Sequence, residues 1–195
     1  MLADLLYSLR EIEFIFNLFG YISFRSGLAL VSSFFLVILL MPYWIRIQLR
    51  FFPSGQPIRN DGPKTHYLKK GTPTLGGVLI LFSIIISSIM WTSNFSNFNY
   101  ILILTLILFG IIGFIDDYKK VKIGKGITTK TKFIGQLLAT VIIFFTIKYY
   151  GFELNKFHIP FLKDTYLELG YFYFVLILFI IIGATNATNL TDGLD

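Results

Sequence analysis

Gly113-Phe114-Ile115-Asp116-Asp117-Tyr118-Lys119-Lys120 closes an apolar run that begins at Tyr100. Residues 101–115 contain no charged side chain, and two carboxylates and two lysines follow within five positions. The run approaches the ~20 residues that cross the hydrocarbon core of a membrane, which predicts a membrane-spanning helix. Two adjacent carboxylates repel each other and favour a cation beside them, either Mg²⁺ or a lysine. From these residues alone, a metal or catalytic site and a solvated helix end are both open.

The composition indicates a polytopic membrane protein. Of the 195 residues, 55% are hydrophobic and only 14% are charged, with a mean hydropathy of +0.71, whereas soluble domains carry roughly 25% charged residues. The net charge of +6 would suit nucleic acid, but the basic residues gather in short segments beside apolar runs. There they set topology and contact lipid headgroups, so no nucleic-acid partner is expected. The absence of cysteine excludes disulfides and thiolate metal sites.

The apolar runs predict an all-α transmembrane helical bundle within a single integral-membrane domain, residues 1–195. Residues 1–20 mix apolar with charged side chains and are interpreted as an interfacial amphipathic helix. Five spans of nearly the required length follow. They are predicted at residues 27–44, 75–91, 100–115, 133–150 and 169–184.

Two basic loops, residues 45–74 and 116–132, set the predicted orientation. Residues 92–99, between the second and third spans, carry no charge. The positive-inside rule therefore places both basic loops in the cytoplasm and the N-terminus outside. The basic residues of the two loops are Arg46, Arg50, Arg59, Lys64, Lys69, Lys70, Lys119, Lys120, Lys122, Lys125, Lys130 and Lys132.

Polar residues also precede the second span and follow the fifth, on the same predicted face. Thr72-Pro73-Thr74 reads as the start of a helix and, with a nearby lysine, suits an anion such as phosphate; loop-forming residues that only set topology are the alternative. After the last span, Asn186, Asn189, Asp192 and Asp195 recur every three residues. Such side chains are costly to bury without a polar partner, so a ligand or cation site competes with a capped helix end.

Four motifs in order carry a resemblance over essentially the whole chain. The sequence closely resembles the phospho-N-acetylmuramoyl-pentapeptide-transferase family, within the polyprenyl-phosphate sugar-1-phosphate transferase superfamily. The motifs are Arg59-Asn60-Asp61-Gly62-Pro63, Lys69-Lys70-Gly71-Thr72-Pro73-Thr74-Leu75-Gly76-Gly77, Gly113-Phe114-Ile115-Asp116-Asp117-Tyr118 and Asn189-Leu190-Thr191-Asp192-Gly193-Leu194-Asp195.

The resemblance implies an Mg²⁺-dependent transferase of the bacterial cytoplasmic membrane. It would move phospho-MurNAc-pentapeptide from UDP-MurNAc-pentapeptide to undecaprenyl phosphate, giving lipid I and UMP. This is the first membrane step of peptidoglycan synthesis, on which cell shape and division depend. The resemblance further implies a cytoplasmic active-site face and a homodimer of the full-length protein.

Residue roles carry over from the family by motif. Asp116 matches the carboxylate assigned as the base for the lipid phosphate, and Asp117 matches a metal or substrate contact. Lys132 and Asp192 match further catalytic residues, with Asp192 also implied as a metal ligand. The implied substrate-binding residues are Lys69, Thr74, Asn189, Gly193, Leu194 and Asp195.

Family members are about twice as long as this chain and have roughly ten spans. The resemblance therefore implies an N-terminal part, with the principal metal ligand expected beyond residue 195 and no activity for residues 1–195 alone. Two alternative functions remain. One is a related transferase that moves a different UDP-linked amino sugar, such as UDP-GlcNAc, to a polyprenyl phosphate. The other is a transporter subunit, which the charge-free cores of the spans disfavour.

Overall fold

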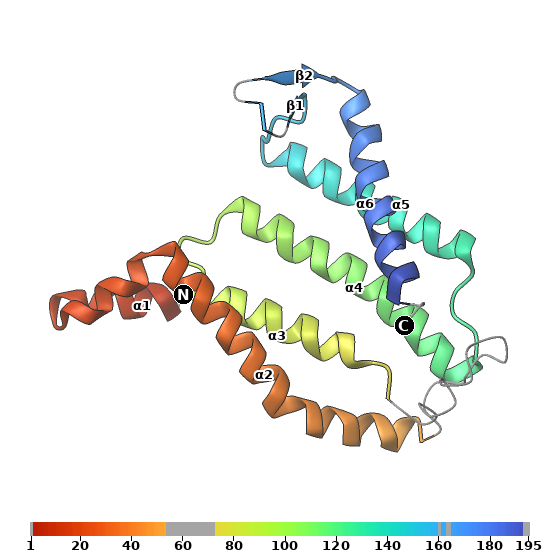
Figure 1. The fold of residues 1–195 in the computed structure, drawn as a ribbon, viewed down its shortest axis with the longest axis horizontal. Coiled ribbons are helices and arrows are strands. Elements are labelled where there is room, and N and C mark those ends of the chain that lie inside the picture. The colour runs from red at the N-terminus through yellow and green to blue at the C-terminus, as the bar shows by residue number, and fades with distance from the viewer. Residues whose placement is uncertain (1, 54–72, 160, 163–164, 193–195) are drawn as a thin grey trace. The chain divides into compact units, whose positions relative to one another are not determined.

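The computed structural model describes residues 2–53, 73–159, 161–162 and 165–192, and it divides into two compact units, Met1–Ile127 and Thr128–Asp195. In the first unit, Figure 1 labels the helices α1, α2, α3 and α4; two short 3-10 helices lie between α1 and α2. Their bounds are α1 Leu2–Ser8, η1 Leu9–Glu11, η2 Phe14–Gly20, α2 Ile22–Phe51, α3 Gly76–Trp91 and α4 Asn97–Ile123. The second unit contains α5 Thr129–Tyr149, β1 Lys156–His158, β2 Tyr166–Glu168 and α6 Phe172–Asp192.

The prediction of an all-α transmembrane bundle is confirmed. By length and composition, α2, α4 and α5 can each cross a membrane, while α3 and residues 172–188 of α6 are shorter apolar helices. Each of the five predicted ranges overlaps one of these helices, with different bounds. The only strands among the described residues are β1 and β2.

Few of the described side chains are buried, the most deeply buried ones include polar side chains, and many large apolar side chains are exposed. Ser83, Ser87, Gln136 and Thr140 are at most 1% exposed, whereas Phe179 is 76% exposed. Exposure of so large an apolar surface to water would be unfavourable, whereas lipid tails can solvate it. Membrane helices pack against one another through small and hydrogen-bonding residues. The burial pattern therefore agrees with a membrane environment.

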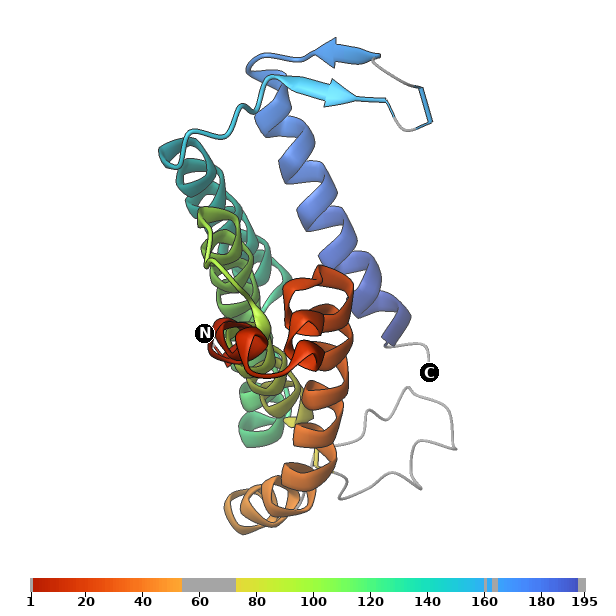
Figure 2. The ribbon, with the colours of Figure 1, turned by 90° about the vertical axis from the view of Figure 1, so that its left-hand side faces the viewer.

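The α2, α3 and α4 helices form the body of the first unit. Helix α3 packs against both α2 and α4, and the two views agree that the end of α2, the start of α3 and the end of α4 lie at one end of the unit (Figures 1 and 2). At Gly110 of α4, an added Cβ would lie 2.6 Å from Leu81 Cδ1. A glycine here allows α3 and α4 to approach closely.

Residues 2–20 fold back on themselves instead of forming the one helix expected from the sequence. Glu13 has extended backbone angles, φ −138° and ψ 128°, which separate η1 from η2. The chain then returns to α1, and the ring of Tyr7 packs so closely over Gly20 that a Cβ there would lie 2.7 Å from it. The segment is also tied to α3, because Phe19 stacks on Trp91 with ring centroids 6.0 Å apart.

Helix α4 extends beyond the predicted span 100–115. It continues to Ile123 and ends where Gly124 adopts φ 81°, the left-handed conformation of a glycine C-cap. Much of the predicted loop 116–132 is therefore helical, since α5 begins again at Thr129. Asp116 and Asp117 consequently lie on the last two turns of a helix.

In the second unit, α5 packs against α6. The segment between them contains an antiparallel ribbon in which Phe157 pairs with Leu167 (Figure 2). Ring contact between His158 and Tyr166, with centroids 5.9 Å apart, adds to this pairing.

Candidate functional site

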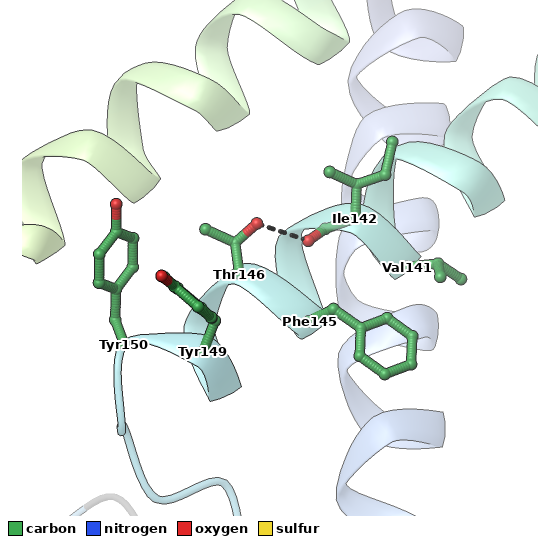
Figure 3. A pocket seen from close by; sticks show the side chains of 6 residues that line it. All are labelled: Val141, Ile142, Phe145, Thr146, Tyr149 and Tyr150. Atoms are coloured by element: carbon green, nitrogen blue, oxygen red, sulfur yellow. Dashed lines mark hydrogen bonds between the residues drawn. The ribbon is translucent and has the colours of Figure 1, made fainter.

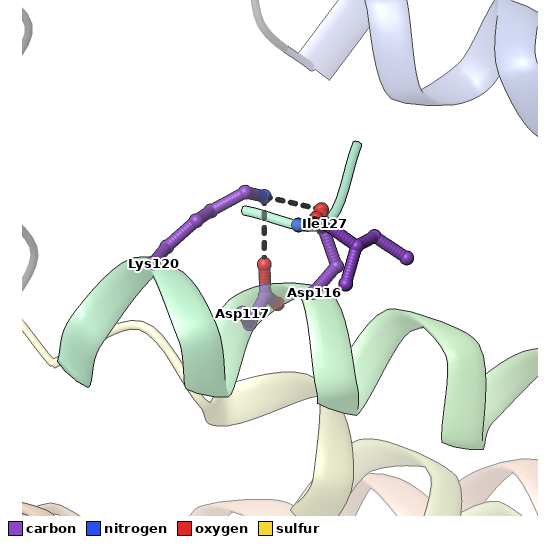
Figure 4. Close-up of polar contacts among 4 residues, drawn as sticks. All are labelled: Asp116, Asp117, Lys120 and Ile127. Carbon is purple, nitrogen blue, oxygen red and sulfur yellow. Dashed lines mark hydrogen bonds and ion pairs between the residues drawn. The ribbon is translucent and has the colours of Figure 1, made fainter. Parts of the chain in front are cut away.

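The end of α4 brings two carboxylates and one ammonium group together (Figure 4). Lys120 Nζ lies 2.8 Å from Asp116 Oδ2 and 2.9 Å from Asp117 Oδ1. Helical residues three and four positions apart are neighbours on one face, so extension of α4 past residue 115 places Lys120 beside both carboxylates. Lys120 is thus the cation that offsets the repulsion between the adjacent aspartates in this structure.

Asp116 is also anchored from the loop that follows the helix. Its Oδ1 accepts a hydrogen bond from the backbone N–H of Ile127 at 2.9 Å, and the residue is only 6% exposed. A carboxylate buried to this extent requires such partners. Lys120 therefore holds one oxygen of Asp116, and the loop holds the other.

Asp117 differs from its neighbour in exposure. Its side chain is 41% exposed, against 9% for that of Asp116. No group of three or more His, Asp or Glu side chains occurs among the described residues. However, Mg²⁺ is commonly held by only one or two carboxylates together with water and substrate phosphates. The donor type and number offered by the aspartate pair fit that ion, with Asp117 the more accessible ligand.

Two side chains of α2 clamp the backbone at the start of α3. Trp44 Nε1 donates to the carbonyl oxygen of Leu75 at 2.9 Å, and Gln48 Oε1 accepts from the Leu75 N–H at 3.3 Å. Trp44 and Gln48 are one turn apart, so one face of α2 satisfies both backbone groups. Thr74, the residue before Leu75, is held in place by this clamp. The hydroxyl of Thr74 is buried and has no hydrogen-bond partner among the described residues.

An aromatic contact brings the end of α2 to the end of α4. Phe52 packs edge-on against Tyr118, with ring centroids 5.8 Å apart. Tyr118 directly follows Asp117, so this contact places the end of α2 close to the aspartate pair. Lys69 lies outside the described residues.

In the second unit, a buried amide pair joins α5 to α6. Gln136 Oε1 accepts a hydrogen bond from Asn186 Nδ2 at 2.9 Å, and Gln136 is fully buried. Lys132 lies one turn before Gln136, in the first turn of α5, and is half-buried. Lys132 and Gln136 therefore lie on the same face of α5.

The other predicted site residues lie at the end of the chain, where the structure describes only some of the atoms. The helical spacing expected for the polar residues at the end of the chain is found, because α6 continues to Asp192. Asn189 and Asp192 have a described backbone, but their side chains lie outside the description, as do all atoms of Gly193, Leu194 and Asp195.

A shallow hollow on α5 contains none of the predicted site residues (Figure 3). Its most central polar group, the Thr146 hydroxyl, already donates to the Ile142 carbonyl oxygen at 2.8 Å. The lining residues are Val141, Ile142, Phe145, Thr146, Tyr149 and Tyr150. This apolar surface offers no charged group to a phosphate.

Sequence reasoning missed three polar residues that organise these regions. A lysine was one of the two cations expected beside the aspartates, but Lys120 was not singled out, although its spacing from Asp116 and Asp117 on a continued helix is a pairing signal. Gln48 and Gln136 also went unnoticed. A glutamine within the apolar run after Phe133 is itself a sign of a buried polar contact.

The comparisons with known proteins agree with the four motifs. Residues 99–195 match the model of glycosyl transferase family 4. Over the whole chain, the sequence is 42% identical to the phospho-N-acetylmuramoyl-pentapeptide-transferase of Desulfotalea psychrophila and 40% identical to that of Rickettsia prowazekii. The resemblance to this family is confirmed. The chain spans about half the length of these phospho-N-acetylmuramoyl-pentapeptide-transferases, 55% of each.

Proposed function

We propose that the protein to which this chain belongs transfers phospho-MurNAc-pentapeptide from UDP-MurNAc-pentapeptide to undecaprenyl phosphate. An oxygen of the lipid phosphate attacks the phosphorus joined to the sugar, and the bond from that phosphorus to UMP breaks. The products are lipid I and UMP. Support comes from the similarity to phospho-N-acetylmuramoyl-pentapeptide-transferases over the whole chain.

The observation that carries the proposal is the charged cluster at the end of an apolar helix. Asp116, Asp117 and Lys120 lie directly after the uncharged segment of α4. A site at such an edge is open to a lipid phosphate from the membrane and to a nucleotide from water. Phosphoryl transfer depends mainly on alignment and charge neutralisation, which carboxylates and a lysine at one place can provide.

Within this proposal, Asp116 accepts the proton of the attacking lipid phosphate, and Asp117 contacts the metal or the substrate. Transfer of one proton to a positioned carboxylate contributes typically 10²–10⁴-fold to a rate. Lys132 neutralises phosphate charge, while Lys69, Thr74 and Asn189 contact the nucleotide substrate. Gly193, Leu194 and Asp195 form part of the uridine pocket.

Asp117 and Asp192 would hold Mg²⁺, together with a principal ligand outside this sequence. When bound, the ion would neutralise negative charge on the phosphate oxygens. The aspartate pair fits this role by donor type, as described above.

The proposed setting is the bacterial cytoplasmic membrane, with the end of α4 facing the cytoplasm. The two basic segments of the sequence, residues 45–74 and 116–132, support this orientation. The positive-inside rule predicts that both lie on the cytoplasmic side. The full-length protein is proposed to act as a homodimer, as the resemblance implies.

The test is a transfer assay with the purified full-length protein in detergent. UDP-MurNAc-pentapeptide, undecaprenyl phosphate and Mg²⁺ should yield UMP and lipid I in equal amounts, and omission of the lipid or chelation of the metal should stop both. UDP-GlcNAc in a parallel reaction distinguishes the related transferases. UMP release from UDP-GlcNAc alone, or from neither nucleotide, would contradict the proposal.

A further inference from the structure

Gly126 lies in the short loop between α4 and α5, against the side chain of Asp116. A Cβ built on Gly126 would overlap Asp116 Oδ1, and it would lie 3.3 Å from Asp116 Cγ and 3.2 Å from Lys120 Cε. Any side chain at this position therefore requires the carboxylate to move.

The carboxylate is poorly placed to move. Oδ1 is held by the Ile127 N–H at 2.9 Å and Oδ2 by Lys120 at 2.8 Å, and Asp116 is buried. Charge-assisted hydrogen bonds of this kind are short and stronger than neutral ones. A shift large enough to admit a methyl group at residue 126 would break the contact with Ile127, whose N–H belongs to the next residue in the same loop.

The requirement for glycine at residue 126 is steric. Gly124, two residues earlier, has φ 81° and ends α4 through a left-handed conformation, which favours glycine for its backbone. The positive-φ glycines of the described chain are Gly124, Gly151 and Gly170, so Gly126 is not among them. Its missing side chain, rather than its backbone freedom, is what the structure uses.

We propose that Gly126 is a positioning residue of the phosphoryl-transfer site, acting through Asp116. The space that it leaves allows the loop to approach the end of α4, so that the Ile127 N–H holds Asp116 in the orientation paired with Lys120. This inference rests on the proposed function for its kinetic consequence. The close approach of Gly126 to Asp116 is independent of that function.

The first experiment compares Gly126→Ala with Gly27→Ala in the full-length protein. Gly27 lies on α2 with no atom near an added Cβ, so it controls for the substitution itself. A misplacement of about 1 Å in a catalytic group can cost about 10²-fold in rate. We expect Gly126→Ala to lower kcat by about that factor, with KM for UDP-MurNAc-pentapeptide and the Tm little changed. The Gly27→Ala protein should retain the wild-type kcat.

A double-mutant cycle separates positioning from a general loss of structure. If Gly126 acts only through Asp116, Gly126→Ala should cause no further loss of kcat in an Asp116→Asn protein, because residues in contact couple. Losses that multiply would overturn the proposal. So would a Gly126→Ala protein with the kcat of the Gly27→Ala control.

A folding readout covers the case in which Gly126→Ala alone lowers the Tm strongly. Asp116→Ala removes the carboxylate that an added Cβ would overlap and leaves only Lys120 Cε, the end of a flexible side chain, close to it. The Asp116→Ala/Gly126→Ala protein should therefore regain the Tm of Asp116→Ala. A Tm that stays low would contradict the proposed contact. Failure of the wild-type protein to release UMP would instead contradict the proposed function, independently of this result.

Discussion

Asp116 Oδ1 accepts a hydrogen bond from the backbone N–H of Ile127, which lies eleven residues later in the chain. Lys120 holds the other oxygen of Asp116 from within the same helix. One carboxylate therefore joins the end of α4 to the loop that follows it. A neighbouring carboxylate, Asp117, shares the lysine but stays more exposed, which gives adjacent aspartates two different environments.

Replacement of either aspartate by asparagine should lower transfer while the protein still folds. Asparagine keeps the size and much of the hydrogen bonding but removes the charge. Loss of a proton acceptor or of a phosphate-aligning charge costs typically 10²–10⁴-fold in rate, or roughly 3–5 kcal/mol. UMP release by Asp116→Asn and Asp117→Asn, at saturating Mg²⁺, measures the effect.

A solvated helix end would respond differently. Its charges change stability by only about 0.3–1 kcal/mol through the helix dipole, and the rate would stay near that of the wild type. Rates within about threefold of wild type for both variants, far from the 10²–10⁴-fold expected of an acid–base group, would therefore exclude a catalytic role. Saturating Mg²⁺ keeps weakened metal binding from resembling lost chemistry.

The clamp on Leu75 predicts a stability loss at Gln48. Gln48→Leu retains volume but leaves the buried N–H of Leu75 without its acceptor, which costs about 1–3 kcal/mol. Thermal unfolding in detergent should show a lower Tm for Gln48→Leu. Tyr43→Phe, which alters an exposed residue on the same helix, should not lower the Tm. Equal values for the two variants would show that the Gln48 contact contributes no stability.

The extent of the helices shows what the sequence can and cannot predict. Hydropathy identified the span that ends at Ile115, because it records where apolar side chains stop. It did not show that α4 continues, since a helix ends where its backbone hydrogen bonds end, at Gly124. The signal was present: a glycine preceded by lysines is a typical helix C-terminus. With the helix extended to it, the pairing of Lys120 with both aspartates follows.

Other contacts depend on packing between distant segments and have weaker sequence signals. Trp44 at the end of a span predicts an interfacial ring, and its indole N–H also donates to Leu75, 31 residues away. The positioning of Gly126 over Asp116 likewise depends on the path of the loop. The resemblance predicts Asp116 as a site residue, whereas its contacts with Ile127 and Gly126 have no signal in the sequence.

The buried amide pair Gln136–Asn186 should contribute only modestly to stability. Hydrogen bonds between membrane helices average about 0.6 kcal/mol in double-mutant cycles, and Gln136 Nε2 has no partner among the described residues. A cycle with Gln136→Leu and Asn186→Leu, followed by unfolding in mixed micelles, should give a coupling near that average. A coupling above about 2 kcal/mol, beyond the measured range of such bonds, would indicate a larger polar network around this pair.

Single cysteines at the two ends of α4 test whether this helix crosses the membrane. The chain has no native cysteine, so each introduced thiol reports on one position. Helix α4 has 27 residues and is therefore about 40 Å long at 1.5 Å per residue, enough for a hydrocarbon core of about 30 Å. Ser96 precedes the helix and Lys125 follows it. A membrane-impermeant maleimide should label Ser96→Cys only from outside and Lys125→Cys only from the cytoplasm.

The first basic segment provides the decisive third position. Lys64 lies outside the described residues, but the positive-inside rule places its segment in the cytoplasm with Lys125. Lys64→Cys should therefore be labelled in inside-out vesicles and protected in right-side-out ones, opposite to Ser96→Cys. Permeabilised membranes, in which all three cysteines should react, confirm that each thiol is accessible. If Lys64→Cys and Ser96→Cys reacted from the same side, α3 would not cross the membrane, and the predicted five-span topology would be wrong.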